Sequence, residues 1–216
     1  MKIVEGSIFF LLLLNMMGCT YHLAVYHVGL SEVERPIDAK DRYGEQQIIR
    51  FKDQGKTKYR FEDEMVEIIW GVMPTQIAFE LRNKTTHSIK IIWDETVYVD
   101  ELGESKRVMH SGVKYSEKNN SQPPTVIPRG TTVTDMIVPV DNVSYGSGSG
   151  WKEKPLLPNQ TLSAGSPISV DVFESIVKEY VGKTIQVLLS LKIEDVVNEY
   201  IFSFVVNDVE IRKVTP

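Results

Sequence analysis

Hydrophobic and polar residues alternate along most of the chain from Ile48 onward. The clearest alternation lies near the C-terminus, in residues 185–193 and again in residues 200–206. A period of two places successive side chains on opposite faces of a strand. The pattern therefore predicts a C-terminal hairpin of two long strands, joined by a turn at residues 194–198. Weaker alternation predicts further strands at residues 48–52, 57–63, 65–72, 77–82, 89–93, 97–99, 106–110 and 132–139.

Three segments interrupt this alternation. Residues 111–126 and 140–167 are long and irregular, with many polar residues, Gly and Pro, and we expect them to be loops. Residues 170–183 carry apolar side chains at helical spacing, with Gly182 as a stop signal. Because many short strands are predicted beside at most one short helix, at about residues 171–181, the expected fold class is an all-β antiparallel sandwich.

The first twenty residues have a different character. An apolar run from Ile8 to Leu14, extended by Met16 and Met17, ends close to Cys19, the only cysteine of the chain. The run has about ten residues, whereas a helix that crosses a bilayer needs roughly 20. It suits the apolar part of a secretion signal. Since the rest of the chain lacks cysteine, a disulfide framework is excluded, and stability must come from a hydrophobic core.

Residues Met16-Met17-Gly18-Cys19 resemble the lipobox of bacterial lipoproteins, whose usual form is Leu, a small residue, Gly or Ala, and Cys. The resemblance implies cleavage after Gly18 and a diacylglycerol thioether on Cys19, so that acyl chains hold the new N-terminus at a membrane. Thr20 instead of Asp after the cysteine resembles lipoproteins that are sent to the outer membrane. The alternatives are an ordinary signal peptide with a chance cysteine, or a cysteine buried in the core.

This resemblance leads to an expected division of the chain into three parts. Residues 1–18 are the lipoprotein signal peptide, and residues 19–47 are the lipidated N-terminus and a poorly patterned tether. Residues 48–216 are a single β-sandwich domain. The expected location is the bacterial cell envelope, on either the periplasmic or the outer face of the membrane.

The sequence pattern of the domain resembles a family of envelope domains. A strand, an Asn-containing turn, I-K-I-x-W at residues 89–93 and I-P-x-G-T at residues 127–131 resemble the immunoglobulin-like domains of bacterial envelope lipoproteins. The similarity spans about residues 60–210 and implies an immunoglobulin-like sandwich. The Cys–Trp–Cys core of antibody domains is absent, so the kinship is one of architecture.

Charge and motif spacing exclude several classes of function. The formal net charge is −5 and no Lys/Arg stripe occurs, so nucleic acid is not an expected partner. The run GSGSG at residues 146–150 has Gly where a nucleophile elbow needs Ser. His110 and Ser111 are neighbours on a strand and point to opposite faces. Acidic pairs lack the spacing of a calcium loop and are expected at solvated strand ends. The remaining histidines, His22, His27 and His87, give no zinc-ligand spacing with His110.

We therefore predict no catalytic residue, no metal site and no cofactor. The candidate partner contacts are instead Tyr145 and Trp151, two large aromatic residues beside a Gly/Ser run. The alternative is that Trp151 folds back to cap the sandwich. Trp70 and Trp93 lie on predicted strands and are expected in the core.

The expected function is a lipid-anchored, non-enzymatic binding or structural module of the bacterial cell envelope. Its partners would be the membrane, through acyl chains on Cys19, and a protein of the envelope. One alternative is a hydrolase or glycan-acting enzyme with its site in loops 111–128 and 140–167. Another is a carrier that holds a small apolar ligand between its sheets.

Overall fold

The computed structural model describes residues 20–36 and 38–215, and almost every element in it is a β-strand. The strands are β1 (Tyr21–Glu34), β2 (Gln47–Asp53), β3 (Lys56–Glu62), β4 (Val66–Val72), β5 (Ile77–Asn83), β6 (Ile89–Ile91), β7 (Val97–Val99), β8 (Ser105–Met109), β9 (Thr125–Ile127), β10 (Thr132–Pro139), β11 (Val143–Gly146), β12 (Gly150–Glu153), β13 (Thr161–Leu162), β14 (Thr184–Ile193) and β15 (Val196–Val214). The helices are α1 (Ala39–Tyr43) and α2 (Val170–Lys178), with short 3₁₀ turns at Trp93–Glu95, Tyr115–Glu117 and Val140–Asn142.

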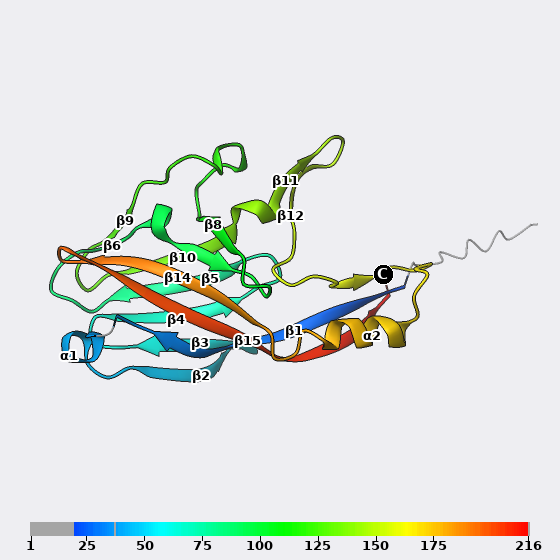
Figure 1. Ribbon diagram of the computed structural model, residues 1–216, viewed down its shortest axis with the longest axis horizontal. Helices are drawn as coiled ribbons and strands as arrows, with labels where there is room; N and C mark the ends of the chain where they lie inside the picture. The colour runs from blue at the N-terminus through cyan, green and yellow to red at the C-terminus, as the bar shows by residue number, and fades with distance from the viewer. Residues whose placement is uncertain (1–19, 37, 216) are drawn as a thin grey trace, which may run out of the picture.

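All the strands except β11 and β12 belong to one antiparallel sheet. Its main order is β13-β1-β15-β14-β7-β8-β10-β5-β4-β3-β2, and β6 pairs with β14 and β9. The sheet curls, so that β1, β15 and β14 form one layer and β5, β4 and β3 form the other (Figure 1). The predicted all-β antiparallel sandwich is therefore confirmed. Its two layers are halves of one continuous curled sheet.

Large aromatic side chains fill the space between the layers. The ring of Trp70 on β4 lies 4.7 Å from that of Phe202 on β15, centroid to centroid, and Phe61 on β3 lies 5.4 Å from the same ring. Trp70 and Trp93 are both buried, as predicted, although Trp93 lies in the 3₁₀ turn after β6 and not on a strand. Burying such a ring contributes roughly 1.5–3 kcal/mol relative to leaving it in water. The core can thus stabilise the fold without a disulfide.

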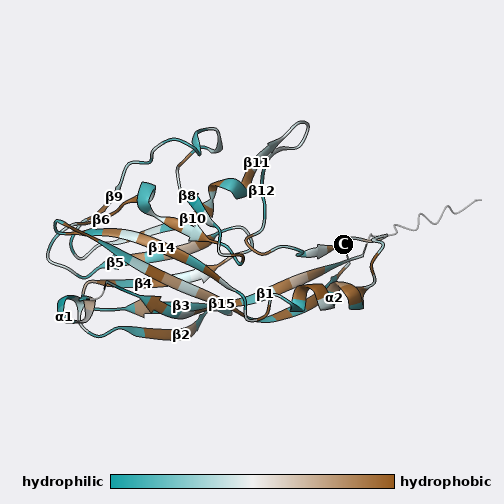
Figure 2. Cartoon of the chain, viewed as in Figure 1, coloured by the Kyte–Doolittle hydropathy of each residue, from teal (hydrophilic) through white to brown (hydrophobic). Residues whose placement is uncertain are grey.

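The C-terminal hairpin follows the predicted alternation. Figure 2 shows apolar residues interrupted by polar ones along β14 and β15. The two strands pair from Thr184 with Val205 to Ile193 with Val196, so the turn has two residues, Glu194 and Asp195, and is shorter than the predicted turn at 194–198. The inward faces predicted for the other strands are also found, for example at Ile77, Phe79, Leu81, Ile89 and Ile91, all buried.

Helix α2 occupies the predicted position. It runs from Val170 to Lys178, close to the expected 171–181, and the Ser169 hydroxyl caps it by accepting a hydrogen bond from the Val172 N–H. Phe173 and Val177 are buried against the sandwich. Gly182 follows the helix with a φ of 86°, a backbone conformation that suits glycine.

The tether expected at residues 19–47 is the main point at which the structure differs from the sequence interpretation. Tyr21–Glu34 form the long strand β1, which pairs with β15 from Tyr21 opposite Val214 to Glu34 opposite Ile201. Ala24, Leu30 and Val33 are buried in the core. The segment is thus an integral strand of the sandwich, and the interpretation of it as a tether is wrong.

Two irregularities in strand pairing explain why this strand escapes detection. The register shifts between His27 and Val28, where Asn207 of β15 is the extra residue, and again between Leu30 and Glu32, where Ser31 of β1 is the extra residue. Only the bulge at Ser31 adds a residue to β1, and it moves the side chains that follow it to the other face of this strand. Leu30 and Val33 can both be buried although they are three residues apart. A period of two therefore does not persist along β1.

A buried polar network holds residues 35–36 and 38–43 against the sandwich. The Arg35 guanidinium lies 3.3 Å from Asp63 Oδ2 and also donates to the Gly44 carbonyl at 3.1 Å. Asp63 accepts a further hydrogen bond from the Tyr200 hydroxyl at 3.2 Å. Burial, followed by the negative charge of Asp63, raises the pKa of Tyr200 far above its ordinary value, so the phenol stays protonated and can donate. Tyr43 on α1 donates to the Asn198 side chain on β15.

Candidate functional site

The β11–β12 hairpin, Val143–Glu153, projects from the sandwich as a separate two-stranded sheet (Figure 1). Tyr145 and Trp151 are directly opposite each other on its two strands. Their ring centroids lie 5.3 Å apart in an edge-to-face arrangement. The Tyr145 side chain is 67% exposed and that of Trp151 is 42% exposed. We call this segment the aromatic hairpin.

The position of Trp151 bears on the two interpretations of the sequence. Trp151 lies on the projecting hairpin and is absent from the buried core, so it does not cap the sandwich. The structure brings the two candidate contact residues together on one exposed feature.

A third aromatic residue supports the hairpin from the neighbouring loop. The Tyr115 ring lies 5.7 Å from that of Trp151, centroid to centroid, in an edge-to-face contact. The Tyr115 hydroxyl donates to the Glu153 carboxylate at the base of β12. This hydrogen bond raises the pKa of Tyr115, and burial and the carboxylate charge act in the same direction. Tyr115 is therefore a neutral donor at physiological pH, and it fixes one side of the Trp151 ring.

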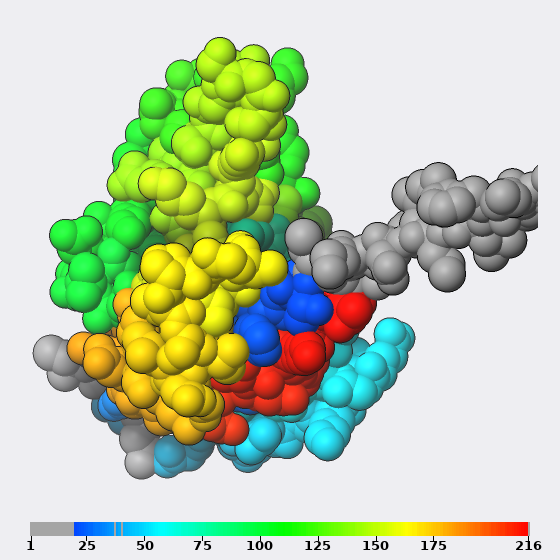
Figure 3. Space-filling view, turned by 90° about the vertical axis from the view of Figure 1, so that its right-hand side faces the viewer, coloured from blue at the N-terminus to red at the C-terminus, as the bar shows by residue number. Residues whose placement is uncertain are grey.

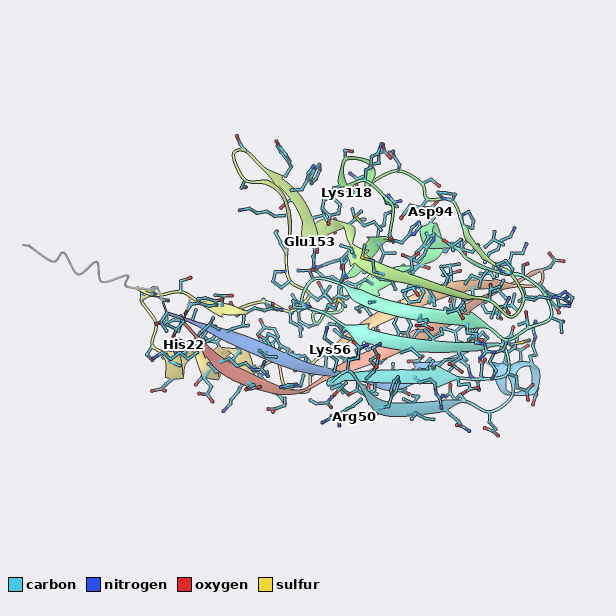
Figure 4. All side chains as sticks on the ribbon, turned by 180° about the vertical axis from the view of Figure 1, so that it is seen from behind. His22, Arg50, Lys56, Asp94, Lys118 and Glu153 are labelled. Atoms are coloured by element: carbon cyan, nitrogen blue, oxygen red, sulfur yellow. The ribbon has the colours of Figure 1, made fainter. Side chains whose placement is uncertain are left out.

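Hydrogen bonds at two places hold loop 111–124 against the rest of the fold. Lys118 Nζ donates to the Val140 carbonyl at 2.8 Å and to the Val143 carbonyl, where β11 begins. The Asp94 carboxylate accepts from the Ser121 hydroxyl and from the Gln122 N–H. The Ser121 hydrogen bond is the largest contribution that lowers the pKa of Asp94, so this carboxylate stays charged. Figure 4 labels Asp94, Lys118 and Glu153, which lie along this side of the molecule.

Sequence reasoning missed Tyr115. It lies in the polar run K-Y-S-E-K-N-N, where strand and helix periodicity give no signal. The feature that identified Trp151, a large aromatic ring in an otherwise polar loop, applies equally to Tyr115. The two irregular stretches of the sequence thus meet in space, and the aromatic residue of each contributes to one cluster.

His110 has a more specific environment than the sequence indicates. Its Nδ1 lies 3.1 Å from Asp135 Oδ2, and its ring stacks on Trp93 with a centroid separation of 4.2 Å. The Ser111 N–H donates to the other oxygen of the same carboxylate. A cavity of about 350 Å³ borders this group, lined by His110, Ser111 and loop residues that include Glu117 and Gln122. Within residues 20–36 and 38–215, no hydroxyl is hydrogen-bonded to His110 Nε2.

A cleft of about 700 Å³ lies where β1 and β15 separate from β2, β3 and β4. Tyr26, Tyr59 and Met73 line it, together with the cationic side chains Arg50 and Lys56. Figure 4 labels the last two. This cleft is open and has a charged rim, unlike the sealed apolar cavity that would favour the carrier hypothesis.

The lipid-attachment prediction concerns residues at the edge of the structure. Gly18 and Cys19 lie outside the described residues, and Thr20 is the first residue inside them. In the described part of the chain, no helix has the length and apolar character needed to cross a membrane. Nor do these residues contain a group of three or more His, Cys, Asp or Glu side chains placed to hold a metal ion.

The acidic pairs do not all occupy solvated strand ends, as the sequence led us to expect. Asp63 and Asp100 are buried and hydrogen-bonded. Both residues follow the end of a strand, as predicted, but they are buried because they bind partners distant in sequence or the backbone of the adjacent turn.

The chain was also compared with known proteins. No protein-family model, curated protein sequence or solved structure matches it.

Proposed function

We propose that this chain is a lipid-anchored, non-enzymatic binding or structural module of the bacterial cell envelope. The apolar run before Gly18 and Cys19, and the resemblance of residues 16–19 to a lipobox, support a membrane anchor made of acyl chains on Cys19. After delivery to the outer membrane, the sandwich would be displayed close to the bilayer. A protein of the envelope would then bind to its exposed features.

The observation that carries the binding proposal is the exposed pair Tyr145 and Trp151 on the aromatic hairpin. Aromatic side chains dominate the energy of many protein interfaces because each buries a large area while fixing few rotatable bonds. Cross-strand pairing, together with the Tyr115 contact to Trp151, already restricts these rings. A partner would therefore lose less conformational entropy on binding than it would with a mobile loop.

Crosslinking in native cells tests this proposal. A photoreactive amino acid replaces Tyr145 in one strain, and Leu102 in a control strain. Leu102 is 74% exposed in the turn after β7, so both positions are accessible. We expect a discrete envelope protein to be captured from position 145 and not from position 102. Equal capture from both positions, or none from 145, would count against the hairpin as the binding feature.

Once the partner is identified, Trp151→Ala should weaken its binding by roughly 30-fold, the effect of losing about 2 kcal/mol at an aromatic anchor. The measurement is the dissociation constant for the purified partner, with Leu102→Ala as the control. Because Trp151 lies outside the buried core, the thermal midpoint should change little. An unchanged dissociation constant would remove Trp151 from the interface.

One contact favours a second candidate, the hydrolase with a site in the loops. In hydrolytic triads an Asp orients a His through Nδ1, which is the arrangement of Asp135 and His110. If this candidate is right, the full chain will turn over a member of a panel of ester, peptide and glycan substrates, and His110→Ala will abolish turnover. His87→Ala, at an exposed position in the β5–β6 turn, should leave it intact. Absence of turnover across the panel would mean that the His110–Asp135 pair is structural. It would then hold the start of loop 111–124 against β10.

A further inference from the structure

The N-terminal end of β1 lies very close to the proposed anchor. Tyr21 is paired with Val214, and His22 with Leu162, so the chain is already part of the sheet two residues after Cys19. Two residues span at most about 7 Å. If Cys19 carries acyl chains, as the proposed function requires, this end of the sandwich has no spacer and must lie against the membrane surface.

The same end of the molecule carries α2 and the loop before it. Figure 3 views this end directly: the segment around residues 155–175, in yellow, lies beside the start of β1, in blue, and the end of β15, in red. Helix α2 contacts both of these strands. The face nearest the anchor is therefore built largely from α2 and its preceding loop.

Helix α2 and the residue before its cap expose apolar side chains that the sandwich does not use. Ile168 and Val172 are exposed, and Ile176 is half-buried. Val172 and Ile176 are four residues apart and lie along one side of α2, and Ile168 immediately precedes the capping residue Ser169. The helix already buries Phe173 and Val177 against the core. A surface helix normally turns polar residues away from the core, so this second apolar stripe indicates a further contact.

The surroundings of the stripe are compatible with a lipid surface. A cavity of about 430 Å³ adjoins it, lined in part by Leu162, Ile168 and Ile176. Glu174 on α2 is paired with Lys178 at 2.6 Å, which offsets its charge. Lys213, opposite His22, is exposed and has no ion-pair partner among the described residues, so it can attract anionic headgroups.

We infer that the stripe Ile168, Val172 and Ile176 rests on the phospholipid surface that holds Cys19. The acyl chains would supply the attachment, and the stripe would fix the orientation of the sandwich on the membrane. The far end, at the β14–β15 turn, would then point away from the bilayer (Figure 1). An amphipathic helix in such a position buries its apolar side about 5–10 Å into the headgroup region.

Fluorescence quenching in vesicles tests the inference on the full chain, expressed in bacteria and reconstituted in phosphatidylcholine and phosphatidylglycerol. An environment-sensitive fluorophore is attached to Val172→Cys in one sample and to Val197→Cys in the other. These two valines are matched, each 47% exposed, but Val197 lies at the β14–β15 end. Nitroxide-labelled lipid should reduce emission from position 172 by about half and leave position 197 almost unchanged, because quenching requires contact at headgroup depth.

The outcomes separate this inference from the proposed function. A protein that lacks the acyl modification or does not remain with the vesicles would overturn the anchor itself. A protein that is acylated and vesicle-bound, but is quenched equally or not at all at the two positions, would overturn only the contact made by α2. If position 172 is shielded from solvent in native envelopes but is not quenched in vesicles, the stripe binds a protein instead of lipid. This result would also overturn the inference. In the double variant Ile168→Ser and Ile176→Ser, we expect anchoring to persist while quenching at position 172 falls to the level at 197.

Discussion

Replacing Cys19 with Ser is expected to abolish acylation of the chain and to release it from membranes. A serine hydroxyl cannot form the thioether that the lipobox resemblance implies. The described residues contain no membrane-spanning helix that could replace the lost anchor. The primary measurement is the mass of the N-terminal peptide, supported by incorporation of radioactive fatty acid. The second is the fraction of protein that stays with membranes after an alkaline wash.

The size of this effect follows from the number of acyl chains. One chain gives only marginal, reversible binding, because each buried methylene contributes about 0.8 kcal/mol, whereas several chains anchor a protein stably. Loss of every chain should therefore change the distribution from almost fully membrane-bound to almost fully soluble. Thr20→Ser is the matched control, since it places a serine at the next position and keeps Cys19.

Two results would contradict the anchor. The first is an acyl group that persists in Cys19→Ser, which would place the modification elsewhere. The second is a native protein whose N-terminal residue is something other than an acylated Cys19. Folding should be unaffected in both variants, because strand β1 begins only at Tyr21. Circular dichroism of the released protein can verify that the sandwich is intact.

Strands that keep strict alternation could be predicted from the sequence. In β5 and β14, the side chain at every second position is buried in the same core, so the hydrophobic pattern reports burial directly. The turn between β2 and β3 has two residues, Gln54 and Gly55, and both adopt the positive φ that such a turn requires. In these segments the information is local, within a few residues of the element itself.

The missed features depend on contacts between distant parts of the chain. Strand β1 is interrupted by bulges that arise from its pairing with β15, and no local pattern encodes them. Gly29 illustrates the same dependence: a Cβ atom there would lie 2.3 Å from the Tyr59 hydroxyl, a residue of β3. The close approach of β1 to β3 thus requires glycine, but the sequence around Gly29 does not reveal it.

The candidate site was predictable in part. Tyr145 and Trp151 were identifiable because large rings are unusual in a Gly/Ser-rich stretch, and the structure pairs them across a hairpin. Tyr115 became part of the site only because loop 111–124 folds onto the base of that hairpin. The partner of His110, Asp135, lies 25 residues away on β10, so adjacent-residue reasoning could not find it.

The other prediction with a large expected effect concerns Asp63, whose carboxylate links the N-terminal segment to both layers of the sandwich. Besides Arg35 and Tyr200, it accepts hydrogen bonds from the N–H groups of Met65 and Val66, at 2.8 and 2.9 Å. Its side chain is fully buried, and that of Arg35 is 9% exposed. We expect Asp63→Ala to lower the free energy of unfolding by about 3–5 kcal/mol, because it leaves a guanidinium charge buried without its partner.

This loss would be a large part of the stability of a single domain, which is typically about 5–15 kcal/mol. The measurement is the midpoint of unfolding in guanidinium chloride, compared between variants whose unfolding free energy has the same dependence on denaturant concentration. Asp195→Ala is the matched control: Asp195 is fully exposed in the β14–β15 turn, 3.5 Å from Lys192, and its loss should cost less than about 0.5 kcal/mol.

The variant Arg35→Met removes the guanidinium charge but leaves the other hydrogen bonds of Asp63 in place. In this variant Asp63 keeps its two backbone donors and the Tyr200 hydroxyl, so the carboxylate remains partly satisfied. The expected loss is therefore smaller than for Asp63→Ala, roughly 1–3 kcal/mol. A loss of stability that decreases in the order Asp63→Ala, Arg35→Met, Asp195→Ala would establish that the network holds residues 35–36 and 38–43 in place. If Asp63→Ala were no more destabilising than Asp195→Ala, the N-terminal segment would have to be held by its other contacts, such as the β1–β15 pairing and the Tyr43–Asn198 hydrogen bond.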